Sequence, residues 1–106
     1  MRGEVFALRP PKNGRGHEQQ GRRYAVIVQA SRFTHLSTWL AVPTSTSAQP
    51  FVFRPEVQVP GKGAALALCE GLSAIDPEAR LAESLGTLSY AEMQAIDEAL
   101  TLLLDL

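Results

Sequence analysis

Short apolar stretches separated by turn-forming residues fill the first two thirds of the chain, which is the pattern of a mainly β protein. Residues 3–8 alternate between apolar and polar side chains, as expected of a strand with one buried face. Residues 24–29 form a continuous, largely β-branched run, which predicts a buried central strand. Three further stretches complete the expected set of strands: residues 39–42, 51–59 and 64–69.

Proline, glycine and clustered polar residues mark where these strands should end. Pro43 is expected to end the strand before it, because proline has no backbone N–H to donate to a ladder. Residues 44–49 almost all carry hydroxyl or amide groups and predict a loop. Pro55 marks an edge or a bulge, and Gly61 with Gly63 predicts a turn.

The chain closes with helical rather than strand periodicity. Ser89 and Glu92 have the spacing of a capping box, which predicts the start of a helix. The apolar side chains that follow predict one face that packs on the core or forms a dimer seam: Met93, Ile96, Leu100, Leu103 and Leu104.

Shorter segments connect these elements. Residues 31–36 predict a turn or a short helical connection, and Asp76 before Pro77 predicts a single helical turn. Residues 85–88 predict one more strand. Residues 9–21 predict a loop whose length is typical of functional loops. The order of strands followed by one helix favours a mainly β fold, a curled sheet or small barrel with a C-terminal helix.

The composition fits one soluble domain that spans residues 1–106, with 45% hydrophobic and 20% charged residues. No apolar run approaches the roughly 18 residues that cross a bilayer, and no signal-peptide pattern opens the chain. We therefore expect a cytoplasmic protein with no membrane partner. Cys69 is the single cysteine and stands in an apolar run, so we expect a buried structural thiol rather than a nucleophile.

Charge is distributed unevenly along the chain, although the net charge is only −1. Residues 1–54 contain eight Lys or Arg and two carboxylates, whereas residues 55–106 contain two Lys or Arg and nine carboxylates. The first part therefore has six surplus positive charges, which is typical of a face that binds nucleic-acid phosphates. Uneven scattering of charge without a function is the alternative interpretation.

The available residues disfavour several kinds of chemistry. Two histidines and one cysteine without paired spacing give no zinc-binding pattern, so we expect no metal and no cofactor. Neither histidine has a patterned partner for a nucleophilic triad. No glycine-rich loop links a strand to a helix as in nucleotide-binding folds.

Several short motifs are more informative in their order than singly. Residues 16–23, GHEQQGRR, run directly into the long apolar strand. VPTSTS follows at residues 42–47, and Pro50-Phe51 comes soon after. With RGEV at residues 2–5 and the closing strand and helix, these motifs resemble the MazF/PemK toxin family over essentially the whole chain.

This resemblance implies a fold, an activity and partners. Members of the family fold as a curled five- to seven-stranded antiparallel sheet, an SH3-like barrel, with a C-terminal helix, and they form homodimers. They are endoribonuclease toxins of type II toxin–antitoxin systems, and they cleave single-stranded RNA rather than DNA in a basic groove that spans both subunits. A cognate MazE-like antitoxin neutralises them by laying a disordered acidic tail in that groove.

The resemblance also implies a reaction and roles for single residues. A ribose 2′-OH would attack the adjacent phosphorus and leave a 2′,3′-cyclic phosphate and a 5′-OH. Arg23 matches the catalytic arginine that would stabilise the phosphorane, and Ser45 matches a hydroxyl that would bind a phosphate oxygen. Glu18 matches a loop glutamate that shapes the site, and the proton acceptor stays open between Glu18 and His17. The side chains expected to bind RNA are Arg15, His17, Arg22, Tyr24, Thr44, Thr46 and Glu70.

The sequence departs from the family pattern at a few positions. Tyr24 stands where the family commonly has proline, and its ring could stack on a base. Gly71 and Ser73 stand where the family typically has glutamine and arginine, so RNA would be held differently there. A shift of the alignment by one residue would instead put Glu70 at the glutamine position.

Less specific interpretations stay open. Arg23 could be a solvated residue at a strand end, and residues 44–49 an ordinary polar loop. For the whole protein, one alternative is a non-catalytic toxin on the same fold that resembles the CcdB gyrase poisons. The other is a relative that binds RNA or antitoxin without cutting.

Overall fold

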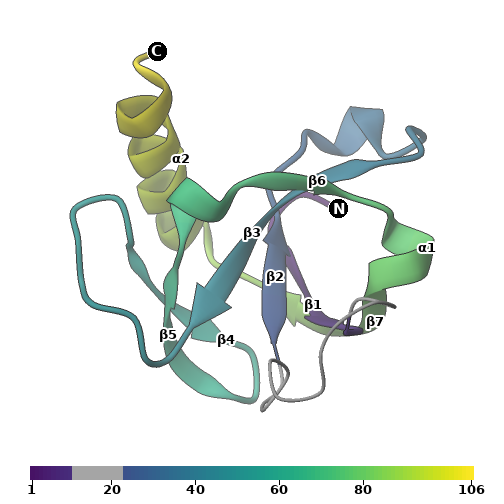
Figure 1. The fold of residues 1–106 in the computed structure, drawn as a ribbon, viewed down its shortest axis with the longest axis horizontal. Helices are drawn as coiled ribbons and strands as arrows, with labels where there is room; N and C mark the ends of the chain where they lie inside the picture. The colour runs from purple at the N-terminus through teal and green to yellow at the C-terminus, as the bar shows by residue number, and fades with distance from the viewer. Residues whose placement is uncertain (11–22) are drawn as a thin grey trace.

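A strongly curved antiparallel sheet forms the centre of the structure, a computed structural model that describes residues 1–10 and 23–106 (Figure 1). Arg15, His17, Glu18 and Arg22 fall outside the described residues, as does most of the loop predicted at 9–21. The described elements are β1 (Glu4–Leu8), β2 (Tyr24–Ile27), the 3-10 helix η2 (Ser31–Phe33), β3 (Trp39–Ser45), β4 (Glu56–Val59), β5 (Gly63–Ala67), the 3-10 helix η3 (Cys69–Gly71), β6 (Ser73–Ile75), α1 (Pro77–Arg80), β7 (Leu81–Thr87) and α2 (Tyr90–Leu104).

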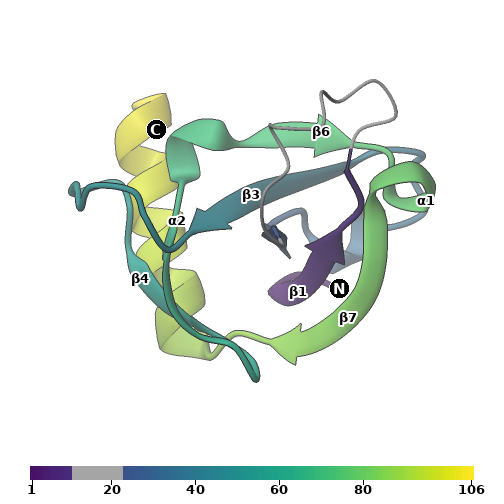
Figure 2. The same ribbon diagram turned by 60° about the horizontal axis from the view of Figure 1, so that its bottom comes forward.

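The seven strands form one sheet in the order β4-β5-β3-β2-β1-β7, and β6 pairs with β3. All the pairings are antiparallel. The sheet curls so far that the end of β7 comes close to the β4–β5 turn (Figure 2). Gly86 of β7 lies there against the ring of Pro60, since an added Cβ would stand 3.2 Å from Pro60 Cβ. The curled antiparallel sheet with a C-terminal helix confirms the predicted fold class.

The two faces of the sheet bury different side chains, and this explains the continuous apolar run in β2. Val26 and Val28 belong to the larger core cluster, which includes Ile96 of α2. Ala25 and Ile27 belong to a second cluster on the opposite face. A strand covered on both sides needs apolar residues at every position rather than at alternate positions.

Helix α2 begins with the predicted capping box. The Ser89 hydroxyl accepts from the Glu92 backbone N–H at 3.1 Å, and the Glu92 carboxylate accepts from the Ser89 N–H at 2.9 Å. Ile96 is fully buried, but the predicted apolar face does not stay in the core along its whole length. Leu103 and Leu104 are 36% and 53% exposed, because the last turns of the helix run past the sheet (Figure 1). None of the helices in the described part is long and apolar enough to cross a membrane.

Glu92 also ties the start of α2 to the sheet, because its carboxylate accepts from the Gln58 backbone N–H of β4 at 2.6 Å. Burial alone would raise the pKa of Glu92, but the hydrogen bonds from Ser89 and Gln58 outweigh it and lower the pKa. A carboxyl group whose pKa is lower in the folded state stabilises the fold above its unfolded pKa. That stabilisation is lost as the pH falls through the folded pKa.

We therefore expect Glu92→Gln to lower the free energy of unfolding by about 1–2 kcal/mol at pH 7. The difference from the wild type should shrink as the pH falls below 4.5, the ordinary pKa of the group, because the carboxyl of the unfolded chain is protonated first and that of the folded protein only at lower pH. Urea titrations of both proteins at pH 7 and at pH 3 measure this. A difference that stays constant between the two pH values would show that the charge of Glu92 contributes nothing.

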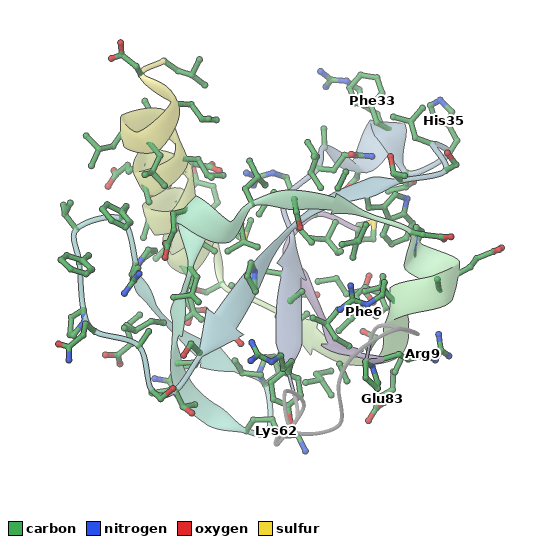
Figure 3. The ribbon with its side chains drawn as sticks, viewed as in Figure 1. Phe6, Arg9, Phe33, His35, Lys62 and Glu83 are labelled. Atoms are coloured by element: carbon green, nitrogen blue, oxygen red, sulfur yellow. The ribbon has the colours of Figure 1, made fainter. Side chains whose placement is uncertain are left out.

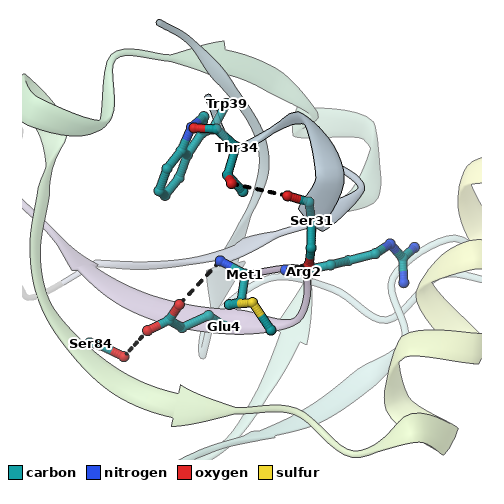
Figure 4. Close-up of polar contacts among 7 residues, drawn as sticks. All are labelled: Met1, Arg2, Glu4, Ser31, Thr34, Trp39 and Ser84. Carbon is teal, nitrogen blue, oxygen red and sulfur yellow. Dashed lines mark hydrogen bonds and ion pairs between the residues drawn. The ribbon is translucent and has the colours of Figure 1, made fainter. Parts of the chain in front are cut away.

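The N-terminal residues fasten β1 to its neighbours (Figure 4). The Glu4 carboxylate accepts a hydrogen bond from the Ser84 hydroxyl of β7 at 2.6 Å. Arg2 donates from Nε to the Val28 carbonyl at 3.0 Å, and its guanidinium forms an ion pair with Asp97 of α2. The positive charge of Arg2 is therefore used in contacts within the fold. The uneven charge distribution had placed Arg2 in the half of the chain expected to bind phosphates.

Strand β3 does not end at Pro43, contrary to the prediction, but continues to Ser45. The Pro43 carbonyl accepts from Leu68 N–H, so the missing N–H of Pro43 would face the same edge of the strand. On that edge β6 pairs with residues 39–41 and β5 with residues 44–45, and Pro43 falls in the break between them. The proline therefore costs no ladder hydrogen bond there. As a consequence Thr44 and Ser45, predicted to lie in a loop, belong to a strand.

The segment 51–59 was also predicted to be extended throughout, but only Glu56–Val59 is a strand. Arg54 organises a turn before it, since its N–H donates to the Phe51 carbonyl at 2.9 Å. The Arg54 guanidinium lies over the Phe51 ring at 4.9 Å and forms an ion pair with Glu70. Arg54 thus folds the segment through its neighbour Phe51 and through Glu70, which is distant in sequence.

Smaller differences concern the limits of elements. β5 ends at Ala67, so Cys69 lies in η3 rather than in the predicted strand 64–69. β7 begins at Leu81, earlier than the predicted 85–88, and the seven strands of the sheet lie within the expected five to seven. The predicted short helical segments after Ala30 and after Asp76 are confirmed.

Cys69 is buried, with 1% of its surface exposed, as predicted. Burial, and next the negative charge of Glu70, raise the pKa of the thiol to about 11. The thiol is therefore protonated near neutral pH, which fits a structural residue rather than a nucleophile.

Candidate functional site

A groove of about 340 Å³ opens where the start of β2, the end of β3 and the β4–β5 turn meet. Figure 3 shows Lys62 of this turn at the end of the molecule where β2 begins. The described residues that line the groove are Arg23, Tyr24, 44–47, Val59 and 62–65. Five residues selected from the sequence are among them: Arg23, Tyr24, Thr44, Ser45 and Thr46.

The register of the sheet places Arg23 beside Ser45. Ala25 pairs with Pro43 in the antiparallel ladder between β2 and β3. Continuing that register by two residues puts Arg23 opposite Ser45, and opposite residues in such ladders have Cα atoms about 4.5–5.5 Å apart. The backbone is held at this point because the Arg23 carbonyl accepts from the Leu8 N–H at 2.8 Å. The extension of β3 beyond Pro43 brings Ser45 to the groove that Arg23 also lines.

The side chain of Arg23 is exposed and directed at the solvent-accessible groove that it lines. The ion pairs found among the described residues join Met1 to Glu4, Arg2 to Asp97 and Arg54 to Glu70, and none of them involves Arg23. No acidic residue is among the described residues that line the groove. Within the described part of the chain, no carboxylate therefore competes with an anionic ligand for this guanidinium.

The hydroxyl of Ser45 has a defined orientation. Its Oγ accepts from the Ser47 N–H at 3.2 Å and from the Ala48 N–H at 3.1 Å. With the oxygen occupied as an acceptor, the hydroxyl proton remains for donation. Ser45 is thus suited to donate a hydrogen bond to an anion in the groove rather than to act as a base.

Three other predicted RNA contacts line the groove in different ways. Thr44 is 7% exposed, and its hydroxyl donates to the Tyr24 carbonyl at 3.4 Å, so it chiefly joins β3 to β2. Tyr24 is partly buried and packs against the larger core cluster. Thr46 is exposed at the rim. Of the three, Thr46 is the one most open to a ligand.

Glu70 is not brought to this groove. Its carboxylate receives two hydrogen bonds from Arg54, at 3.0 and 2.6 Å, and these bonds lower the pKa of Glu70. Gly71 is explained by the close approach of Pro43, since an added Cβ would lie 3.0 Å from Pro43 Cγ. Any larger residue at position 71 would press against the strand that carries Ser45.

A second hollow, of about 230 Å³, shares Arg23 with the groove. Ser73, which stands at the position of the family arginine, lines this second hollow, and so does Arg80. Arg23 therefore stands between two adjoining depressions.

Sequence reasoning missed Lys62, which lines the groove from the β4–β5 turn. The pairing of β4 with β5 brings it there, and sequence patterns do not report which long-range neighbours a turn will meet. The one available signal was a cation between two turn glycines, Gly61 and Gly63. For metals, the described part of the chain contains no group of three or more His, Cys, Asp or Glu side chains placed to hold an ion.

Comparisons of sequence find a family and a relative that this chain resembles. A family model described as the PemK-like, MazF-like toxin of type II toxin–antitoxin systems matches residues 1–104. A candidate toxin of Mycobacterium tuberculosis (strain ATCC 25618 / H37Rv), Rv3098A/RVBD_3098A, is 51% identical over 61 residues. That match covers 58% of this chain and 57% of the length of the relative.

Comparisons of structure agree with the fold. The Mycobacterium tuberculosis toxin MazF-mt6 superposes with a TM-score of 0.77 at 18% identity, over 97% of each chain. MazF from Deinococcus radiodurans gives 0.76 at 24% identity, over 99% of this chain and 96% of that one. An endoribonuclease from a mycobacterial species, solved in complex with its cognate antitoxin, gives 0.75 at 21% identity, over 100% and 95%. At these identities the likeness is one of fold.

Proposed function

The chain belongs to the PemK-like, MazF-like toxins of type II toxin–antitoxin systems, and we propose that it is an endoribonuclease that cuts single-stranded RNA without a metal ion. The observation that supports this proposal is a groove that Arg23 and Ser45 line together and whose described lining is free of acidic residues. A guanidinium and a hydroxyl donor together match the needs of a phosphoryl transfer through an anionic transition state.

In the proposed reaction the 2′-oxygen of a ribose forms a bond to the adjacent phosphorus and loses its proton to a base. Arg23 neutralises the extra negative charge of the phosphorane, and Ser45 donates a hydrogen bond to a phosphate oxygen. The bond to the 5′-oxygen of the next nucleotide then breaks, and that oxygen takes up a proton. The products are a 2′,3′-cyclic phosphate and a 5′-OH. Glu18 and His17 are the candidates for the base.

The proposed partners follow from the family and from the site. We propose that the protein acts as a homodimer in the cytoplasm and that a cognate MazE-like antitoxin blocks the groove with an acidic segment. Two groove cations, Arg23 and Lys62, would attract such a segment as they attract RNA. Among the similar structures, the mycobacterial endoribonuclease was solved with its cognate antitoxin, and a MazE–MazF complex of Deinococcus radiodurans also matches this fold.

We expect the purified protein to cut a long single-stranded RNA at a few defined sites and at the same rate with or without EDTA. The new 5′ ends should be hydroxyls, which polynucleotide kinase labels directly, and the 3′ ends should be cyclic phosphates. Loss of cutting in EDTA, or fragments with 5′-phosphates, would contradict the mechanism. If the protein binds RNA or antitoxin tightly but cuts no RNA, the alternative interpretation holds, in which this protein binds without cutting.

A further inference from the structure

We propose that Lys62 is a second phosphate-binding residue, which holds an RNA phosphate neighbouring the one that Arg23 and Ser45 engage. This inference rests on the proposed function and names a substrate contact within the same groove. Lys62 lines the groove from the β4–β5 turn, whereas Arg23 and Ser45 line it from β2 and β3. The two cations therefore reach the groove from different walls.

A backbone hydrogen bond holds the turn that carries Lys62, and the space around the turn is open. The Lys62 N–H donates to the Val59 carbonyl at 2.9 Å and closes the turn. Gly61 and Gly63 have φ angles of 75° and 107°, which residues with a side chain rarely adopt. A Cβ added to either glycine would meet no atom within 4 Å. The backbone conformation, not crowding, requires these glycines.

The electrostatic surroundings leave Lys62 available to a ligand. Its side chain is exposed, and it takes part in none of the ion pairs found among the described residues. The hydroxyl residues Ser45 and Thr46 line the same groove. This lining of cations and hydroxyls suits phosphate oxygens.

The chemistry of the two cations suits different tasks. Arginine presents a planar fork that matches the oxygens of one phosphate, which is appropriate at a fixed reaction centre. A lysine ammonium is a point charge on a flexible stem and tolerates small shifts of its partner. Lys62 should therefore contribute to RNA affinity and positioning, and leave the rate of the chemical step nearly unchanged.

The test uses an RNA oligonucleotide centred on a cleavage site mapped with the wild-type protein and made uncleavable by a 2′-deoxy substitution at that site. One contact to a single-stranded phosphate contributes about 0.7 to the slope of log affinity against log salt, or roughly fivefold in affinity at 0.1 M salt. Lys62→Ala should therefore lower the salt slope by about 0.7 and weaken RNA binding roughly fivefold. Lys62→Arg should restore them, and Lys62→Glu should bind more weakly than Lys62→Ala. Cleavage at saturating RNA should stay within about twofold of the wild type for Lys62→Ala, because the contact is not specific to the transition state.

Arg32→Ala is the matched control, because Arg32 is an exposed cation that lies over the Phe33 ring and does not line the groove. It should leave affinity and salt slope as in the wild type. If the wild type cuts RNA and Lys62→Ala binds with an unchanged salt slope, this inference is overturned while the proposed function stands. A wild-type protein that neither cuts nor binds RNA overturns both.

Discussion

Replacing Arg23 by alanine should lower the rate of RNA cleavage by about 10²–10³-fold, the usual effect of removing one preorganised donor to a developing anion. The reason is that the phosphorane carries one more negative charge than the ground-state diester, and Arg23, which lines the same groove as Ser45, is expected to neutralise it. Affinity for an uncleavable 2′-deoxy analogue should fall only about fivefold, as for the loss of one phosphate contact. Single-turnover cleavage and equilibrium binding measure the two effects separately.

Two variants control for charge and for folding. Arg32→Ala removes an exposed arginine that does not line the groove, and it should cleave and bind as the wild type does. Arg23→Lys keeps the charge but not the planar fork, and it should recover binding better than cleavage. Equal losses of binding and cleavage in Arg23→Ala would reduce Arg23 to one member of a basic patch. The catalytic assignment would then pass to Ser45 or to the segment around Glu18.

Local patterns were sufficient for most of the fold. The two-residue and helical periods, the capping box of Ser89 and the short helix after Asp76 are all properties of neighbouring residues, and the structure has them at the expected places. Pro43 shows where such reasoning fails. Whether a proline ends a strand depends on which edge of the strand its nitrogen faces, and that depends on strands distant in sequence.

The residues of the candidate site could likewise be predicted from the sequence only in part. Arg23 and Ser45 could be found from motifs whose order resembles a known family, and the ladder between β2 and β3 brings them together. Glu70 could not be judged from its neighbours, because its partner Arg54 comes from another loop. Likewise, the division of the sequence into a basic and an acidic half does not describe the groove. Of the two cations among the described residues that line the groove, Arg23 comes from the first half and Lys62 from the second.

Replacing Ser45 by alanine should lower kcat/KM for RNA by roughly 10- to 100-fold, the range expected when a hydrogen bond to a charged group is lost. Ser45 is suited to this role because the Ser47 and Ala48 N–H groups occupy its oxygen and leave the proton for a phosphate. Ser45→Thr keeps the hydroxyl on the same backbone position and should retain most of the activity. Initial rates at low RNA concentration give kcat/KM for each variant.

A structural explanation competes with this one, because Ser45→Ala also removes the acceptor of two loop N–H groups. Ser47→Ala controls for the loss of a groove hydroxyl that leaves both of these hydrogen bonds intact. It removes a neighbouring hydroxyl that lines the same groove, but it keeps the backbone N–H that Ser45 accepts from, so it should cleave nearly as the wild type does. The thermal midpoint of Ser45→Ala should fall by no more than about 10 °C, since each of the two lost turn hydrogen bonds contributes about 1 kcal/mol. If Ser45→Ala cleaves at the wild-type rate, or if Ser45→Thr is as inactive as Ser45→Ala, the hydroxyl serves the loop and does not contact the phosphate.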